Sequence, residues 1–308
     1  MKSSFSRLSF IIFLFTLGCG SAAEEVRENY LLFEGTRAFA EIEAQVAFGP
    51  RVPGSSGASA CAEYLIGRLS SLADSIWNDR WEHLNAAGDT LPLVNICASF
   101  EPAALRRVLL CAHWDTRPVA EHDQDPARRG LPIPGANDGA SGVAVLLELA
   151  RIFSLESPQL GVDIVLFDCE DYGDFYAAQD VLVGSRRFAE MNKNYRPELG
   201  ILLDMVGDRN ASFPYEGYSW NTRPGDCRLV WDTAHRLGYA EHFQRQVGTG
   251  VVDDHLPLLS AGIRCIDIVQ MGLPYWHTHY DTPDKCSPST LEAVGRTIAA
   301  VVYELQMH

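Results

Sequence analysis

Short apolar runs alternate along the chain with amphipathic segments. The run at residues 107–113 is continuous and apolar, which is typical of a strand that is covered on both faces of a sheet. The predicted strands are residues 91–100, 107–113, 162–167, 199–206 and 263–269. The predicted helices are residues 142–153, 228–237, 255–260 and a last one that runs towards Leu305. Ser287 as N-cap and Pro288 in the first turn mark where this last helix begins.

This alternation predicts an α/β fold. Strands that alternate with helices form a mainly parallel sheet with helices on both faces, so we expect a three-layer sandwich with a central mixed, mostly parallel sheet. A helical arm is expected at residues 30–75. The chain has 308 residues, 47% of them apolar, and shows no internal repeat, low-complexity tract or linker. We therefore expect one α/β domain over residues 24–308.

Residues 1–23 are expected to be an export leader rather than part of the fold. Lys2 and Arg7 flank the start of an apolar run at residues 9–18. A run of roughly ten residues is too short to span a bilayer, which takes about 20, and is typical of a secretory signal. The rest of the chain has no segment that predicts a transmembrane helix.

The cleavage point of the leader has two candidates. Residues 17–19 resemble a bacterial lipoprotein box, which would leave Cys19 as the lipid-bearing first residue. Residues 21–23 equally suit an ordinary signal peptidase. The mature chain is therefore expected to be exported, as a periplasmic protein, a membrane-anchored lipoprotein or a secreted protein.

The charge balance narrows the class of partner. The chain carries 25 Lys+Arg and 40 Asp+Glu, a formal net charge of −15. Binding to phosphates needs clustered basic residues, so nucleic acid is not an expected partner. The eight cysteines show no Cys-x-x-Cys spacing. Most of them are expected to be buried core residues, although export would permit one or two disulfides.

Polar clusters follow the predicted strands. In open α/β sheets, ligands bind at the carboxyl ends of the strands. Carboxylates gathered there repel one another unless a cation neutralises them, and one imidazole with two carboxylates suits Zn²⁺. The clusters are residues 113–115, the glycine-rich loop 135–142, residues 168–171, Asp204 with residues 207–208, residues 253–255 and residues 276–281. The ordered set predicts a metal site, although no single cluster would do so alone.

The order of these residues resembles the α/β fold of the zinc aminopeptidases. Within that superfamily the details are most similar to the glutaminyl-peptide cyclotransferases, or glutaminyl cyclases. The stretches that carry this likeness are Pro134-Gly135-Ala136-Asn137-Asp138, Gly184-Ser185-Arg186, Asp253-Asp254-His255-Leu256-Pro257-Leu258-Leu259 and Trp276-His277-Thr278. The last two are the more specific, and the resemblance extends from about residue 30 to the C-terminus.

The resemblance implies a role for each matching side chain. The zinc ligands would be Asp138, Asp171 and His277, with one ion favoured and two left open. The catalytic residues would be Glu170 as general acid and base, with Asp204 and Asp253 in a hydrogen-bond network, and Trp276 would contact the substrate. The implied reaction converts the N-terminal glutamine of a peptide or protein to pyroglutamate with release of ammonia. The resemblance also favours a monomer.

Some positions depart from the family pattern. Asp171 stands where the family often has Glu, so its shorter arm must bring the backbone or the metal closer by the length of a methylene group. Tyr176 and Asp267 lie near where the animal enzymes have a pocket Trp and a His. The wall of the substrate pocket is therefore the part of the site where this sequence differs most from the family pattern.

A zinc aminopeptidase is the main alternative. Two-metal peptidases of this fold use a His of the first cluster and an Asp of the fourth as ligands of a second metal, and His113 and Asp204 supply both. His113 therefore either supports the ligands or binds a second metal. A catalytically inactive binding module is a third class, which the intact Glu170 disfavours.

Simpler roles stay open for other residues of the clusters. Asp115 is expected to orient His113, and is otherwise a candidate for the second metal. Asp253 and Asp254 would also serve as an N-cap pair for the helix that begins at His255.

Overall fold

A mixed sheet of six strands runs through the part of the chain that the structure, a computed structural model, describes, residues 29–306. Its strand order is β1-β2-β4-β3-β5-β8. Strands β4, β3, β5 and β8 are parallel to one another, whereas β2 is antiparallel to both β1 and β4. The strands are β1 (Ser75–Leu84), β2 (Thr90–Phe100), β3 (Arg107–His113), β4 (Gly161–Phe167), β5 (Leu199–Asp204) and β8 (Ile266–Val269). A small separate sheet pairs β6 (Phe213–Tyr215) with β7 (Phe243–Val247).

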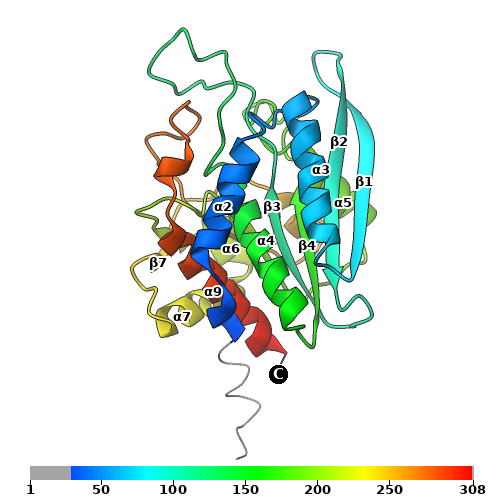
Figure 1. Ribbon diagram of the computed structural model, residues 1–308, viewed down its shortest axis with the longest axis vertical. Helices are drawn as coiled ribbons and strands as arrows, with labels where there is room; N and C mark the ends of the chain where they lie inside the picture. The colour runs from blue at the N-terminus through cyan, green and yellow to red at the C-terminus, as the bar shows by residue number, and fades with distance from the viewer. Residues whose placement is uncertain (1–28, 307–308) are drawn as a thin grey trace, which may run out of the picture.

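Helices cover both faces of the large sheet, which gives the three layers that the sequence predicts (Figure 1). The first face carries α2 (Gly35–Val46), α3 (Ser56–Ser70), α4 (Ala140–Leu155), α7 (Pro224–Arg236) and α9 (Pro288–Leu305). The second face carries α5 (Val183–Met191) and α8 (His255–Ser260). The short helices are η1 (Asn29–Leu32), α6 (Gly217–Thr222) and η2 (Pro283–Lys285).

Successive residues of the central strands point to opposite faces of the sheet. In β3, Val108 and Leu110 belong to the core on the side of α4 and α9, whereas Leu109 and Cys111 belong to the core on the side of α5 and α8. All four side chains are fully buried. Because both faces of the strand are covered, its sequence is continuously apolar and shows no polar alternation.

The predicted elements are present, some with shifted ends. β3 and α8 coincide with the predicted ranges 107–113 and 255–260, whereas β5 ends earlier than predicted, at Asp204. The helical arm consists of η1, α2 and α3. Ser287 is the N-cap of α9, and its side chain accepts a hydrogen bond from the backbone N–H of Ser289.

Strand β1 and helix α5 are elements that the sequence pattern does not predict. β1 is an edge strand, and polar or charged residues occupy most of positions 78–83, which hides its alternation. Helix α5 begins after Leu182, which has no capping side chain, so no start signal precedes it. The two elements hold each other: Arg187 of α5 donates two hydrogen bonds, of 2.6 and 2.7 Å, to the buried Asp79 of β1.

The cysteines of the described residues act as packing residues. These seven cysteines form no disulfide, and all except Cys97 are buried. No helix within residues 29–306 combines the length and the apolar character that crossing a bilayer requires. The leader at residues 1–23, including Cys19, lies outside the described residues.

Candidate zinc site and active site

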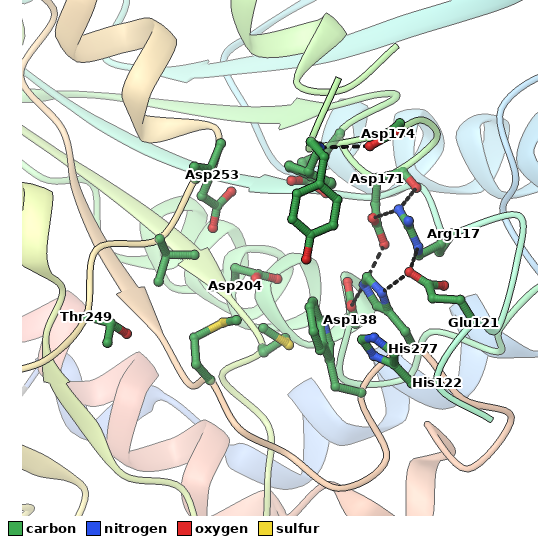
Figure 2. A pocket seen from close by; sticks show the side chains of 18 of the residues that line it. Arg117, Glu121, His122, Asp138, Asp171, Asp174, Asp204, Thr249, Asp253 and His277 are labelled. Atoms are coloured by element: carbon green, nitrogen blue, oxygen red, sulfur yellow. Dashed lines mark hydrogen bonds and ion pairs between the residues drawn. The ribbon is translucent and has the colours of Figure 1, made fainter. Parts of the chain in front are cut away.

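The polar clusters gather at the carboxyl edge of the parallel strands. β3 ends at His113 and β5 ends at Asp204, while Glu170 and Asp171 follow the end of β4. The predicted site residues that line one cavity of about 350 Å³ are Asp138, Glu170, Asp171, Asp204, Asp253, Trp276 and His277 (Figure 2). The fold thus brings together side chains that lie far apart in the sequence, as the strand-end argument predicts.

The three predicted zinc ligands have their side chains in one place. One ligand atom each of Asp138, Asp171 and His277 lies within 4.8 Å of the other two, and all three residues are buried. His277 Nε2 lies 3.4 Å from Asp171 Oδ2 and 3.7 Å from Asp138 Oδ2. Asp171 Oδ2 is buried and has no hydrogen-bond partner among the described residues. A buried carboxylate oxygen is normally satisfied, so this oxygen and the imidazole beside it fit a zinc ion.

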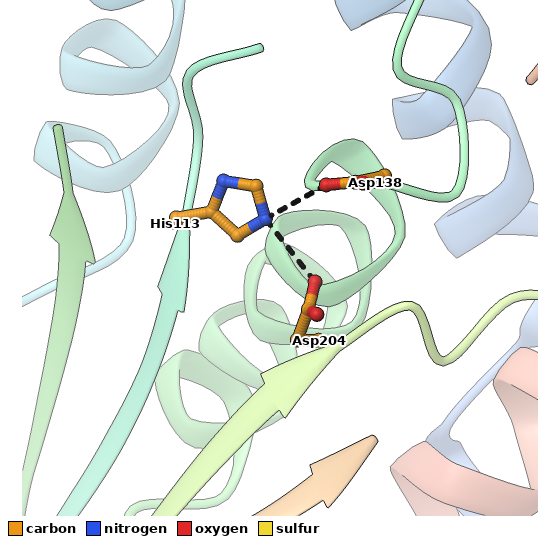
Figure 3. A group of neighbouring side chains, drawn as sticks. All are labelled: His113, Asp138 and Asp204. Atoms are coloured by element: carbon orange, nitrogen blue, oxygen red, sulfur yellow. Dashed lines mark hydrogen bonds and ion pairs between the residues drawn. The ribbon is translucent and has the colours of Figure 1, made fainter. Parts of the chain in front are cut away.

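A second group of potential ligands shares Asp138. His113 Nε2 lies 3.1 Å from Asp204 Oδ1 and 3.2 Å from Asp138 Oδ1 (Figure 3). These three residues also place one ligand atom each within 4.8 Å of one another. Burial lowers the pKa of His113, but the surrounding carboxylates outweigh burial and raise the pKa well above its ordinary value. The geometry therefore suits either a second metal ion or an imidazolium that bridges two carboxylates.

Two buried carboxylates hold the loops that carry the ligands. Asp115 accepts hydrogen bonds from the backbone N–H groups of residues 170–171, at 3.0 and 3.1 Å. Asp281 accepts in the same way from the backbone N–H groups of residues 137–138, at 2.8 and 3.1 Å. Each carboxylate thus fixes two successive peptide groups at a predicted zinc ligand.

Asp115 has a different main contact from the one expected. Its Oδ1 lies 3.4 Å from His113 Nδ1, but Nδ1 makes no hydrogen bond within the described part of the chain. Instead, the backbone N–H groups of Glu170 and Asp171 donate hydrogen bonds to the two carboxylate oxygens of Asp115. The contact with His113 is therefore the longer of the two, although the Asp115 carboxylate also contributes to the raised pKa of His113.

An ion-pair network surrounds Asp171 and His277. It contains two residues that sequence reasoning missed, Arg117 and Glu121. Arg117 donates hydrogen bonds of 2.7 Å to Asp171 Oδ1 and to Glu121 Oε1, and His277 Nδ1 lies 2.8 Å from the same Glu121 oxygen (Figure 2). Arg117 is 54 residues from Asp171 and Glu121 is 156 residues from His277. Because both lie in an irregular segment between β3 and α4, no local pattern marks them.

Glu170 lies in an environment that favours its protonated form. Burial raises the pKa of Glu170 well above its ordinary value. His113 opposes this shift, while the negative charges of Asp171 and Asp253 add to it. A raised pKa brings a carboxyl group closer to the pH at which it can both accept and release a proton.

Asp204 and Asp253 are two acids of the cavity whose pKa values are both raised. Burial, and then the charge of Asp204, raises the pKa of Asp253 to about 7, and burial also raises the pKa of Asp204. Two acids coupled in this way carry fewer than two negative charges at neutral pH. Asp254 occupies the N-cap position of α8, but its side chain makes no capping hydrogen bond, and Asp253 Oδ1 accepts from the Asp254 N–H instead. The N-cap role considered for this pair thus has no side-chain cap to support it.

Aromatic side chains form the pocket wall. The ring of Trp276 lies 3.9 Å from that of His277 and 4.9 Å from that of His122, centroid to centroid. Tyr176 lines the same cavity and is fully exposed at its mouth. Asp267 is not in the wall: it is fully buried, with its Oδ2 3.7 Å from His255 Nδ1.

Left-handed backbone conformations occur at three residues of the site. The φ angles are 59° at Cys169, 48° at Met205 and 54° at His277. Such conformations cost residues other than glycine about 1–3 kcal/mol each and persist where the surrounding structure imposes them. Cys169 precedes Glu170 and Met205 follows Asp204, so the unusual backbone sets the direction of the acids. No glycine marks these turns in the sequence.

Comparison with known proteins identifies the family. Residues 95–302 match the model of peptidase family M28. Among solved structures, glutaminyl cyclase from Tannerella forsythia is 42% identical, with a TM-score of 0.84 over 88% of this chain and 98% of that chain. A leucine aminopeptidase precursor from Bacteroides thetaiotaomicron is 40% identical, with a TM-score of 0.85 over 88% of this chain and 97% of that chain. Among curated proteins, glutaminyl-peptide cyclotransferase from Bos taurus is 26% identical, and the match covers 82% of this chain and 78% of that protein.

These similarities agree with the arrangement of strands and the site. The family model spans the sheet from the middle of β2 onward together with all the predicted ligands. The chain therefore belongs to peptidase family M28 and, within this zinc aminopeptidase-like superfamily, to the glutaminyl cyclases.

Proposed function

We propose that this protein cyclises the N-terminal glutamine of peptides and proteins to pyroglutamate and releases ammonia. The observation that carries the proposal is the position of Glu170. This acid, whose pKa is raised by burial, directly precedes the proposed zinc ligand Asp171 and shares one cavity with Asp204 and Asp253. The family membership described above supports the same reaction.

The reaction depends mainly on how the two reacting groups of the substrate are positioned. The α-nitrogen of the substrate glutamine attacks the side-chain carbonyl carbon of the same residue, so both reacting groups are already in one molecule. A zinc ion held by Asp138, Asp171 and His277 would polarise that carbonyl as a Lewis acid. Glu170 would take a proton from the α-nitrogen as the ring C–N bond forms. It would then deliver the proton to the amide nitrogen, which leaves as ammonia, so the step consumes no other reactant.

Asp204 and Asp253 are proposed to hold the amide nitrogen that leaves. Because the pKa of Asp253 is about 7 and that of Asp204 is also raised, the pair can keep one proton at neutral pH. The ionised partner would accept a hydrogen bond from the amide N–H. Trp276, whose ring lies against His277, would cover the glutamine side chain.

One zinc ion per chain is proposed. The observation that supports one ion is that His113 Nε2 lies within hydrogen-bond distance of Asp138 and Asp204, so these groups satisfy one another. A second ion in the same place would require His113 to lose that proton. A two-zinc aminopeptidase, the alternative that the second ligand group raises, would bind two ions per chain.

A pair of assays on the purified protein tests this function. Ammonia release is measured with peptides that begin with glutamine, and free amino acid release with peptides that begin with leucine or methionine. We expect ammonia and a cyclised product from the first set and no leucine or methionine from the second. Glu170→Gln protein, purified in the same way, is the control for contaminating enzymes. Rapid leucine release together with two zinc ions per chain would favour the aminopeptidase.

We also propose that residues 1–23 direct export and that the mature enzyme is a monomer. Intact mass of the protein from a bacterial host distinguishes the two cleavage points. A first residue at Glu24 indicates an ordinary signal peptide, whereas a lipid mass on Cys19 indicates a lipoprotein. Retention of residues 1–23 would contradict export, and sedimentation of a dimer would contradict the monomer.

A further inference from the structure

We propose that Arg117 and Glu121 are positioning residues that determine which atoms of Asp171 and His277 face the zinc ion. The two residues lie in the segment between β3 and α4 and act on the ligands from the wall of the cavity (Figure 2). The inference rests on the proposed function only through the zinc site, because it concerns binding of the metal before any substrate is present.

Glu121 selects the nitrogen of His277. The Nδ1 atom of His277 lies 2.8 Å from Glu121 Oε1. An ionised carboxylate only accepts hydrogen bonds, so this contact places the ring hydrogen on Nδ1. In the neutral imidazole, which is the form that binds a metal, the lone pair is then on Nε2, the atom that lies 3.4 Å from Asp171 Oδ2 and 3.7 Å from Asp138 Oδ2. A carboxylate behind the imidazole fixes the tautomer and the ring direction that a metal needs.

Arg117 selects the oxygen of Asp171. Its Nη1 donates a hydrogen bond of 2.7 Å to Asp171 Oδ1, whereas Oδ2 has no partner among the described residues. One oxygen is therefore occupied, and the other is left for the metal. The same Nη1 also donates to the backbone carbonyls of Asp171 and Gly173, at 3.3 Å each. Arg117 thus binds both the side chain and the main chain of Asp171, the residue that stands where the family often has the longer Glu.

The two positioning residues form one unit. Arg117 Nε donates a hydrogen bond of 2.7 Å to Glu121 Oε1, the same oxygen that meets His277. The side chain of Arg117 is only 11% exposed, so water screens this network far less than it screens a surface ion pair. A change at Arg117 should therefore reach His277 through Glu121, and a change at Glu121 should reach Asp171 through Arg117.

Zinc affinity of the metal-free protein tests the proposal. We would measure it by competition with a chromophoric chelator in Arg117→Met, Arg117→Lys, Glu121→Gln and the double variant Arg117→Met/Glu121→Gln. Loss of a residue that orients a metal ligand typically weakens metal binding about 10- to 100-fold, and we expect this for each single variant except Arg117→Lys. Lysine cannot bridge two carboxylates, but it keeps the positive charge. The loss of zinc affinity in Arg117→Lys should therefore be smaller than in Arg117→Met. The double variant should lose less than the product of the two single losses, because they disrupt one unit.

A second readout separates positioning from general destabilisation. The visible spectrum of the Co²⁺-loaded protein reports the ligand atoms, and we expect it to change in Arg117→Met and Glu121→Gln. Arg187→Met is the matched control, since Arg187 of α5 also makes a two-bonded pair with a buried aspartate but does not line the cavity that holds the proposed zinc ligands. It should lower thermal stability and leave zinc affinity and the Co²⁺ spectrum unchanged. Zinc affinity within twofold of the parent in Arg117→Met and Glu121→Gln would overturn the proposal, as would an equal loss in Arg187→Met. Because no substrate is used, these results are independent of whether the protein proves to be a cyclase.

Discussion

The carboxylate of Asp115 accepts a hydrogen bond of 3.0 Å from the backbone N–H of Glu170. The other carboxylate oxygen accepts from the next N–H, that of Asp171, at 3.1 Å. Asp115 thereby places the proposed proton-transfer residue and a proposed zinc ligand through their main chain rather than through their side chains. A charged acceptor for two backbone N–H groups is among the stronger polar contacts that a protein makes.

Replacing Asp115 by Asn should therefore affect both metal binding and turnover. Asparagine offers one acceptor oxygen and an amide that donates, so one of the two backbone N–H groups would face another donor. We expect zinc affinity and kcat to fall about 10- to 100-fold, as for other residues that orient metal ligands. Asp74→Asn is a suitable control, because Asp74 also accepts from a backbone N–H group, that of Glu101, but is exposed and does not line the cavity. If Asp115→Asn binds zinc as tightly as the parent, the backbone contact does not position the ligand.

Replacing Glu170 by Gln should abolish most turnover while zinc stays bound. The amide cannot carry the proton, but Glu170 does not belong to the proposed ligand set, so the metal keeps its donors. Loss of a general acid and base typically costs about 10²- to 10⁴-fold in rate. Ammonia release measures the rate, and elemental analysis measures the zinc. Exposed Glu190 of α5, changed to Gln, should leave both unaltered, and near-parental cyclisation by Glu170→Gln would exclude the assigned role.

The strands and the edge that carries the site could be predicted because they depend on local patterns. A strand that is buried on both faces, such as 107–113, must be continuously apolar, and the polar residue that ends it must lie at the edge of the sheet. His113 is the last residue of its strand for this reason, whereas β5 ends at Asp204, before the predicted end of that strand. The two side chains lie close together because β3 and β5 are adjacent parallel strands.

The supporting contacts could not be predicted because they join distant, irregular segments. Asp281 holds the peptide group of Asp138 from 143 residues away, and Glu121 holds His277 across 156 residues. Neither segment has a period that would reveal which way a side chain points. Cys169 and Met205 adopt left-handed conformations that glycine would have signalled, but their environment imposes them instead.

A methyl group at Gly139 should disturb His113. A Cβ atom built at this position would lie 2.5 Å from His113 Cε1 and 2.6 Å from both Nε2 and the backbone oxygen of His113, closer than any relaxed contact, so the imidazole and its backbone must move. His113 would then leave Asp204 and Asp138, and misplacement of a catalytic constellation by about 1 Å can cost on the order of 10² in rate. We expect a loss of this size in kcat for Gly139→Ala. Gly67→Ala is the matched control: nothing lies within 4 Å of a Cβ there in helix α3, so activity should be unchanged and stability should rise by about 0.5–1 kcal/mol.

The raised pKa of Asp253 predicts how the stability of the metal-free protein depends on pH. In the folded chain Asp253 keeps its proton up to about pH 7, whereas in the unfolded chain it loses the proton near its ordinary pKa of 3.8. Between these values the folded state binds more protons, so the free energy of unfolding falls as pH rises and levels off above about pH 8. Asp253→Asn removes the part of this dependence that Asp253 contributes. The variant should match the parent near pH 4 and exceed it above about pH 8, by at most about 4 kcal/mol.

Chemical denaturation across this pH range, with zinc removed by a chelator, measures the difference between Asp253→Asn and the parent. Asp204 titrates together with Asp253, so the measured gain should be smaller than the limit from Asp253 alone, and Asp204→Asn should reduce it further. Asp232→Asn on the exposed side of α7 should follow the parent at every pH. A gain that is largest at low pH would have the wrong sign and would show that Asp253 is ionised in the folded protein well below neutral pH. Asp253 would then lack the proton that the proposed sharing with Asp204 requires.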